Sequence, residues 1–185
     1  MRILVTGGAR SGKSRHAAHL LTTVSTAGQG PGATAPVTFV APGRPADEID
    51  DDDWAARVRH HRAHRPADWR TLETPDVAAA LREVAGPVLV DCLGTWLTGC
   101  VDRLGLWEAP ADEARAAVDE HARELADALA GREDVVLVTN EVGSGVVPAH
   151  RSGGVFRDLL GALNQTVAEQ CHEVHLVVCG RVLVL

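Results

Sequence analysis

The sequence has one lysine and no tyrosine, and aromatic residues make up only 3% of its 185 residues. Lysine and arginine together number 18, so the remaining 17 basic residues (18 − 1) are all arginine. No apolar run approaches the roughly 20 residues that a membrane-spanning helix needs. The first apolar stretch is too short for a secretory signal and leads directly into a glycine-rich loop. We therefore expect neither a membrane span nor a secretory leader.

The sequence also has few cysteines, and its net charge is negative. The net charge of −7 argues against a nucleic-acid-binding face, so we expect no nucleic-acid partner. With 45% hydrophobic residues, 23% charged residues and no internal repeat, the chain is typical of one globular domain over residues 1–185. Four cysteines without C-x-x-C spacing indicate small buried apolar residues in a reducing cytosol, and hence a cytoplasmic protein: Cys92, Cys100, Cys171 and Cys179.

The start of the chain carries the clearest motif. Residues 2–5 are apolar, residues 7–14 fit G-x-x-x-x-G-K-[ST], and the residues that follow predict a helix. A strand, a glycine loop and a helix are the context of a phosphate-binding P-loop, where backbone N–H groups and the helix N-terminus surround an anion. The alternative is a glycine-rich turn that binds nothing, but the only lysine stands at the charged position of the motif. The motif comprises Gly7, Gly8, Ala9, Arg10, Ser11, Gly12, Lys13 and Ser14.

The rest of the chain alternates between helical and strand patterns. Residues 25–36 are rich in Gly, Pro, Ala and Thr and predict a surface loop. The alternation predicts an α/β P-loop NTPase fold, with a mostly parallel sheet flanked by helices and a C-terminal β-hairpin. We expect helices over residues 15–23, 47–64, 75–84, 93–101, 112–130 and 151–170, and strands over residues 2–5, 37–41, 69–73, 88–91, 134–139, 174–178 and 182–185.

Several polar residues follow strands at the end where open α/β sheets bind ligands. Asp91 ends the apolar strand 88–91 in the Walker B pattern, which predicts that it binds Mg²⁺ together with the Ser14 hydroxyl. Asn140 and Glu141 follow the strand 134–139 and precede several glycines. These two residues either lie at the ligand crevice or only cap a loop turn.

Two adjacent histidines, His60 and His61, lie within the predicted helix 47–64. Trp54, Val58 and His61 share one helix face, whereas His60 points about 100° away from it. The segment is either a solvated polar helix face, or it carries a histidine nucleophile beside arginines that bind phosphate oxygens. Four arginines surround the pair: Arg57, Arg59, Arg62 and Arg65.

Six stretches together resemble one family, the bifunctional adenosylcobinamide kinase / adenosylcobinamide-phosphate guanylyltransferases of cobalamin synthesis. They cover most of the chain in the family's order: ILVTGGARSGKSRHA, AARVRHHRAHRPADWRTLE, VLVDCLGTWLTG, VVLVTNEVGSGVVP, FRDLLGALNQ and EVHLVVCG. The resemblance implies that ATP or GTP phosphorylates the aminopropanol hydroxyl of adenosylcobinamide. It also implies that GTP then guanylylates that phosphate through a histidine-GMP intermediate on the second histidine of the pair, His61.

The resemblance further implies a RecA-like P-loop fold, a homotrimer and a set of site residues. Lys13 and His61 would be catalytic, and Ser14 and Asp91 would bind Mg²⁺. Besides residues 7–14, the implied nucleotide contacts are Ala41, Pro42, Gly43, Arg62, Ala63, His64, Arg65, Glu73 and Asp91.

The sequence departs from the family at four places. The 25–36 loop looks longer, residues 41–43 are less polar and offer only backbone contacts, His64 stands where the family can carry glycine, and Asp91 stands where a glutamate can occur. Two alternatives stay open. One is a kinase for another small alcohol in which His61 is structural, and the other is a non-catalytic GTP-binding switch, which would need no nucleophile.

Overall fold

The computed structural model describes residues 1–27, 35–44, 51–63 and 65–185, without the side chains at positions 23–27, 57, 60 and 61. The described strands form one seven-stranded sheet in the order β3-β2-β4-β5-β1-β6-β7. Every strand pair is parallel except β6–β7, which is the expected C-terminal hairpin. The strands are β1 (Arg2–Thr6), β2 (Thr38–Ala41), β3 (Arg70–Glu73), β4 (Val88–Asp91), β5 (Val135–Val138), β6 (Glu173–Val178) and β7 (Arg181–Val184).

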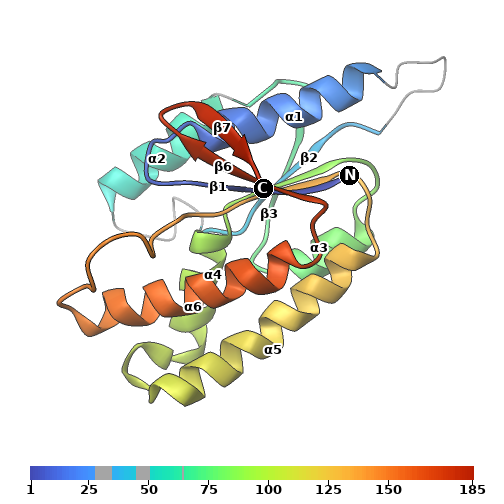
Figure 1. Ribbon diagram of the computed structural model, residues 1–185. Coiled ribbons are helices and arrows are strands. Elements are labelled where there is room, and N and C mark those ends of the chain that lie inside the picture. The colour runs from blue at the N-terminus through green and yellow to red at the C-terminus, as the bar shows by residue number, and fades with distance from the viewer. Residues whose placement is uncertain (28–34, 45–50, 64) are drawn as a thin grey trace.

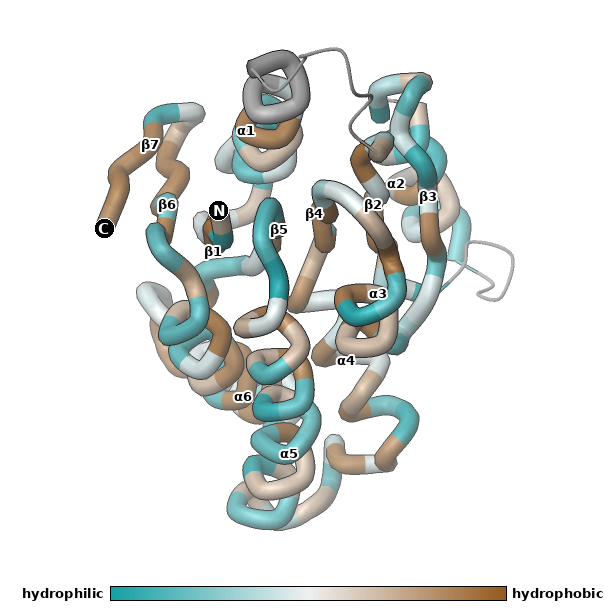
Figure 2. Tube along the Cα trace, turned by 90° about the vertical axis from the view of Figure 1, so that its right-hand side faces the viewer, coloured by the Kyte–Doolittle hydropathy of each residue, from teal (hydrophilic) through white to brown (hydrophobic). Residues whose placement is uncertain are grey.

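Helices cover both faces of the sheet, as Figure 2 shows, because successive strand residues point to opposite faces. Val5 packs with Ala17 and Leu21 of α1 on one face, whereas Leu4 packs on the other face among residues of the later helices. The four strands β1, β2, β4 and β5 are apolar and largely buried, as a parallel sheet between helices requires. The helices are α1 (Lys13–Ala27), α2 (Asp52–Ala63), α3 (Val77–Glu83), α4 (Leu93–Leu104), the 3₁₀ turn η2 (Leu106–Glu108), α5 (Ala111–Ala130) and α6 (Arg151–Ala168) (Figure 1).

The expected alternation of helices and strands is confirmed, and the main differences concern where helices end. α1 continues through residues 25–27, so the predicted 25–36 loop begins too early. Residues 13–27 contain no glycine or proline, so no local signal ends the helix before Gly28. α4 continues to Leu104, where Gly105 ends it with a φ of 67°. Residues 47–50 and His64, which the sequence placed in a helix, lie outside the described residues.

The cysteines are only partly as expected. Cys100 is buried, and Cys92 and Cys171 are partly buried. Burial raises the pKa of the Cys171 thiol to about 11, so this thiol stays protonated. Cys179 is exposed, and the prediction is wrong for this residue. It occupies the β6–β7 turn with a φ of 49°, and a two-residue turn leaves its side chain nothing to pack against.

In the part of the chain that the structure describes, no helix is both long enough and apolar enough to cross a membrane.

Candidate functional site

The P-loop lies where β1 passes into α1, with its first glycine buried against a distant strand. Gly7 has a φ of 152°, and a Cβ atom built on it would lie 2.4 Å from the carbonyl oxygen of Val177. Only glycine fits this position, because any side chain would collide with the backbone of β6. The loop is also tied to the β6–β7 turn, since the Gly180 N–H donates to the Ser11 carbonyl oxygen over 2.9 Å. The hairpin therefore supports the loop from one side.

The polar groups of the P-loop are arranged around its own backbone. The Lys13 side chain is 9% exposed, and its Nζ donates to the Gly8 carbonyl oxygen over 3.0 Å. The hydroxyl oxygens of Thr6 and Ser11 are buried and have no hydrogen-bond partner among the described residues. Gly8, Ala9 and Arg10 are exposed at the rim of the loop.

The strand register places several predicted site residues in one row. Val5 of β1 pairs with Val138, which pairs with Asp91 of β4. In β4, Val90 precedes Asp91 and pairs with Val40 of β2. Ala41 follows Val40 and is therefore level with Asp91. Ala41 in turn pairs with Glu73 of β3. Paired residues of parallel strands share a face. Glu73, Ala41 and Asp91 therefore point to the face of the sheet that α1 covers, beside the P-loop.

Ser14 and Asp91 fit the donor set of a Mg²⁺ that also binds a triphosphate. Ser14 lies in the first turn of α1 and is half-buried, as is Asp91. Mg²⁺ commonly takes one or two protein oxygens and completes its octahedron with phosphate oxygens and water. In the described parts of the chain, no group of three or more His, Cys, Asp or Glu side chains could hold a metal on its own. A hydroxyl and a carboxylate beside a P-loop therefore suit a Mg²⁺ whose remaining ligands are phosphate oxygens and water.

Polar contacts hold Asn140, which follows β5, the strand between β1 and β4. The Asn164 amide nitrogen donates to the Asn140 carbonyl oxygen over 3.1 Å, and the Cys92 thiol lies 3.8 Å from the Asn140 amide oxygen. Burial, and then the charge of Asp91, raise the pKa of the Cys92 thiol. Both effects favour the protonated thiol.

The Glu141 carboxylate closes a turn in its own loop. Its Oε1 accepts hydrogen bonds from the N–H groups of Gly143, over 2.6 Å, and Ser144, over 3.1 Å. Of the two interpretations that the sequence left open, capping of a loop turn is the one that holds for this side chain. The Glu141 backbone still meets the site, because its N–H donates to the Gly7 carbonyl oxygen over 3.1 Å.

The helix that carries the histidine pair docks on the same edge through Trp54. The Trp54 indole N–H donates to the Arg44 carbonyl oxygen over 3.0 Å, and a Cβ built on Gly43 would lie 3.1 Å from the indole ring. Asp51 caps the helix by accepting from the Trp54 N–H over 2.9 Å. The 41–43 segment thus lies directly beneath the start of α2. Pro42 is buried, so any contact it makes with a ligand is through its backbone.

Two arginines, Arg62 near the end of α2 and Arg65 beyond it, contact the neighbouring strands β2 and β3. The Arg62 guanidinium forms an ion pair with Glu73 at 2.5 Å, and the Arg65 guanidinium stacks over the Phe39 ring, 3.7 Å from its centroid. Arg65 also donates to the Thr71 hydroxyl over 3.1 Å. Burial lowers the pKa of Arg65, while the charges of Glu73 and Asp91 act in the opposite direction. A cavity of about 450 Å³ opens here, lined among others by Arg62, Arg65, Trp69, Thr71 and Glu73.

The family model described as cobinamide kinase / cobinamide phosphate guanyltransferase matches residues 3–185 of this chain. The chain belongs to this family. It is 40% identical over 195 residues to the bifunctional adenosylcobalamin biosynthesis protein CobU of Salmonella typhimurium, covering 97% of each chain. It is 38% identical to CobU of Escherichia coli over 97% of each chain. It is 40% identical to CobP of Pseudomonas aeruginosa over 97% of this chain and 94% of that relative.

A solved structure from Pyrococcus horikoshii OT3 aligns over 99% of this chain and 84% of its own, with a TM-score of 0.45 and 10% identity. That likeness is too distant to bear on the fold, which the strand order of this chain establishes. The strand β5 lies between the P-loop strand β1 and the Asp91 strand β4. The two phosphate-site motifs of this cobinamide kinase / guanyltransferase family member are thus one strand apart.

The structure brings most of the predicted residues of the family site to one edge of the sheet. The P-loop, residues 41–43, Arg62, Arg65, Glu73 and Asp91 all lie there. Ala63 is the exposed last residue of α2. His61 lies in α2, but its side chain is not among those described, and His64 lies outside the described residues.

A histidine pair beside the P-loop is a feature that sequence reasoning missed. The His16 Nε2 of α1 lies 2.8 Å from the His175 Nδ1 of β6, and the His175 Nε2 lies 2.7 Å from a carboxylate oxygen of Glu173. His175 is 5% exposed and pairs with Val5 in the row described above. Burial, followed by the neighbouring histidines His175 and His19, lowers the pKa of His16. No local pattern links residues 159 positions apart.

Proposed function

We propose that this chain phosphorylates the aminopropanol hydroxyl of adenosylcobinamide and then guanylylates the resulting phosphate with GTP, at one nucleotide site. The observation that carries the proposal is the meeting of three features at one edge of the sheet: the P-loop, the Asp91 strand, and Arg62 of α2 with Arg65 beyond the helix. A nucleotide switch would need the P-loop but would have no use for a histidine-bearing helix directed to the same edge.

In the kinase step the residues of the P-loop bind and neutralise the triphosphate. Backbone N–H groups of residues 8–14 and the α1 N-terminus surround the phosphates, and Lys13 exchanges its bond to the Gly8 carbonyl for the outer phosphate oxygens. The acceptor hydroxyl oxygen forms a bond to the γ-phosphorus as the bond from that phosphorus to the β,γ-bridging oxygen breaks. The hydroxyl proton is released to solvent, and the nucleoside diphosphate leaves. Positioning and charge neutralisation supply the catalysis.

In the guanylyl step His61 is the nucleophile. Its neutral ring nitrogen attacks the α-phosphorus of GTP, pyrophosphate leaves, and a phosphoramidate joins the ring to GMP. A phosphate oxygen of adenosylcobinamide phosphate then attacks that phosphorus, and the P–N bond breaks to regenerate the imidazole. The positive charges of Arg62 and Arg65 would attract phosphate oxygens. The ion pair between Arg62 and Glu73 sets where that guanidinium lies.

The proposed cofactors are GTP for the guanylyl step, ATP or GTP for the kinase step, and Mg²⁺. Ser14 and Asp91 would hold the metal, which when bound would neutralise charge on the phosphate oxygens. The homotrimer and the cytoplasmic location belong to the same proposal. Sedimentation equilibrium of the purified chain tests the homotrimer directly, with a mass of three chains expected.

The proposal is tested by separating the two activities with matched histidine variants. His61→Asn should lose guanylyl transfer and keep at least part of the kinase activity, because the γ-phosphate passes directly to the alcohol. His60→Asn is the control, and it should keep both activities because its position points off the Trp54 face of the helix. If His60→Asn loses guanylyl transfer and His61→Asn does not, the assignment within the pair is wrong. Unaltered transfer in both variants would remove the covalent step.

A further inference from the structure

The loop that joins β5 to α6, residues 141–150, is anchored at both ends. At its start the Glu141 N–H donates to the carbonyl oxygen of Gly7 in the P-loop. At its end Arg151 donates to the carbonyl oxygens of Trp107 and Ala109, which follow α4. The turn closed by the Glu141 carboxylate shapes the first part of the loop. Hydrogen bonds therefore hold both ends of the loop and its first turn, and the loop starts beside the P-loop.

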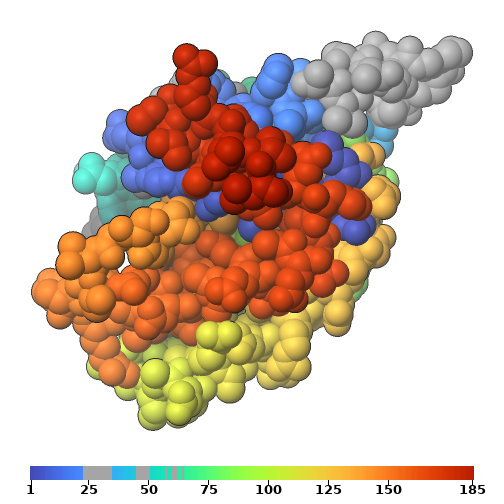
Figure 3. Space-filling view, in the orientation of Figure 1, coloured from blue at the N-terminus to red at the C-terminus, as the bar shows by residue number. Residues whose placement is uncertain are grey.

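This anchored loop presents apolar side chains to solvent. All ten of its residues are exposed, and Val146 and Val147 are 96% and 71% exposed. Val142 is exposed as well. Figure 3 shows the loop, in orange, standing out from the body of the molecule beside the start of α6. Large apolar side chains grouped on a shaped loop mark a binding surface, whereas single exposed ones are ordinary.

A polar cavity of about 280 Å³ adjoins the loop. Gly143 contributes the loop side, Arg157 and Gln165 contribute from α6, and Arg115 contributes from α5. Both arginines have an acidic neighbour, because Arg157 lies 3.8 Å from Asp158 and Arg115 forms a 2.7 Å ion pair with Asp119. The cavity is thus rich in N–H donors, and the charges of its two arginines are offset by Asp158 in the lining and by Asp119 outside it. Such a surface suits a neutral ligand with many carbonyl groups better than a second polyphosphate.

We propose that Val142, Val146 and Val147, together with the cavity beside Arg157 and Gln165, form the surface that binds the corrinoid acceptor. A corrinoid with amide arms has a broad apolar ring for the valines and peripheral amide carbonyls for the arginine and glutamine donors. Its alcohol arm would extend along the loop toward Gly7, where the loop meets the P-loop. This inference rests on the proposed function, because it supplies the acceptor of the same two reactions.

The test uses the full chain, adenosylcobinamide as the probe, and two variants, the double change Val146→Ser/Val147→Ser and the single change Arg157→Gln. Each should raise the dissociation constant for adenosylcobinamide in equilibrium dialysis, and its KM in the kinase assay, by about tenfold or more. The affinity for GTP and the labelling of the protein by GTP alone should stay as in the wild type, because neither needs the acceptor.

Matched controls are Leu104→Ser, which changes an exposed apolar residue at the end of α4, and Arg82→Gln, which breaks an exposed ion pair with Glu124. Both should leave the corrinoid KM unchanged. Unchanged corrinoid binding in the loop variants would overturn the inference. So would a loss of GTP labelling or a change of oligomeric state in them, which would assign the loop to the nucleotide site or to a subunit contact. If the wild type itself neither binds nor phosphorylates adenosylcobinamide, the proposed function fails first, and that outcome is distinct.

Discussion

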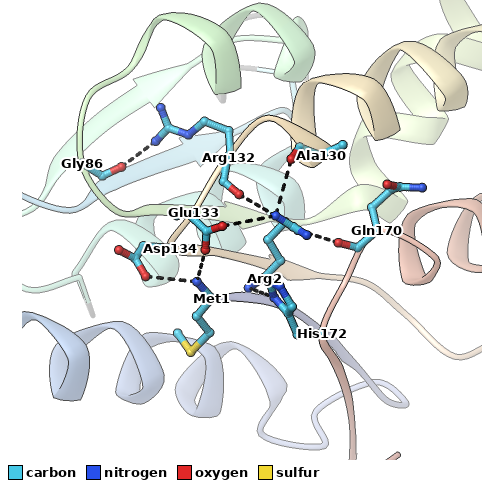
Figure 4. A network of polar contacts seen from close by, with 9 residues as sticks. All are labelled: Met1, Arg2, Gly86, Ala130, Arg132, Glu133, Asp134, Gln170 and His172. Carbon is cyan, nitrogen blue, oxygen red and sulfur yellow. Dashed lines mark hydrogen bonds and ion pairs between the residues drawn. The ribbon is translucent and has the colours of Figure 1, made fainter.

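The amino edge of the sheet is held by arginine side chains that donate to backbone carbonyls, whereas the carboxyl edge carries the P-loop and the other candidate site residues. At the amino edge the Arg2 Nε donates to Gln170 over 2.6 Å and its Nη1 donates to Arg132 over 2.9 Å. The Arg132 Nη2 in turn donates to Gly86 over 2.6 Å. Figure 4 shows this network, in which the backbone N–H of Arg2 also donates to His172.

The carboxyl edge has the opposite construction. The P-loop there has positive φ values at Gly7, Arg10 and Gly12, and buried hydroxyls of Thr6 and Ser11 have no described partner. A positive φ at a non-glycine residue such as Arg10 costs free energy, and residues held in such conformations cluster at functional sites. The difference teaches that in this chain arginine serves both as a structural clamp and as a candidate ligand. The single lysine stands at the one position that calls for a mobile point charge.

Lys13→Ala should give the largest effect. It removes the charge that neutralises the outer phosphates for both reactions, so kcat/KM for each should fall by at least about 1,000-fold. The melting temperature should stay close to that of the wild type. Steady-state assays of the two activities, with circular dichroism as the folding control, measure this. A variant that phosphorylates adenosylcobinamide at near the wild-type rate would contradict a shared phosphate site.

Asp91→Asn should give the next largest effect. It removes the carboxylate proposed to hold Mg²⁺, so turnover should fall on the order of 100-fold while nucleotide affinity changes less. Titration of the kinase rate with Mg²⁺ should show a higher requirement in the variant. An unchanged Mg²⁺ titration at a normal rate would remove Asp91 from the site.

Arg2→Ala should invert the pattern of the first two variants, because it acts at the other edge. The loss of three hydrogen bonds, to the carbonyls of Gln170, Ala130 and Arg132, from a side chain that is 18% exposed should cost about 2 kcal/mol of unfolding free energy and lower the melting temperature by about 5 °C. Both kcat/KM values should stay at the wild-type level. Arg82→Ala is the matched control, since its exposed ion pair with Glu124 should be worth at most about 1 kcal/mol. A fall in activity without a fall in stability would contradict the purely structural role given to the amino edge.

The smallest effect should be a pH dependence of stability that comes from His16. Its pKa is lowered in the folded protein from the ordinary value of 6.5, so the unfolded chain binds a proton more readily. The stabilisation is fully present above pH 6.5 and is lost as the pH falls through the folded-state pKa. Denaturant unfolding at pH 7.5, 6.5 and 5.5 should show a shallower decline for His16→Gln than for the wild type. Equal slopes would contradict a lowered pKa of His16 in the folded protein.

The sequence predicts the parts of this structure that depend on local pattern. The P-loop, the strand that ends at Asp91 and the C-terminal hairpin each follow from residues close together in the chain. The parts it misses depend on distant neighbours. The fit of Gly7 against Val177 and the contact of His16 with His175 join residues that only the fold brings together. Cys179 was expected inside because cysteine usually is, and only the tight β6–β7 turn makes it exposed.

The covalent use of His61 is the central claim, and mass spectrometry of the intact protein after incubation with GTP and Mg²⁺ tests it most directly. The account predicts one added GMP per chain, mapped to His61, labile to acid and stable to alkali, as expected of a phosphoramidate. The adduct should be absent from His61→Asn and present in His60→Asn. An adduct on His60, or no adduct on a chain that still transfers GMP, would contradict the account.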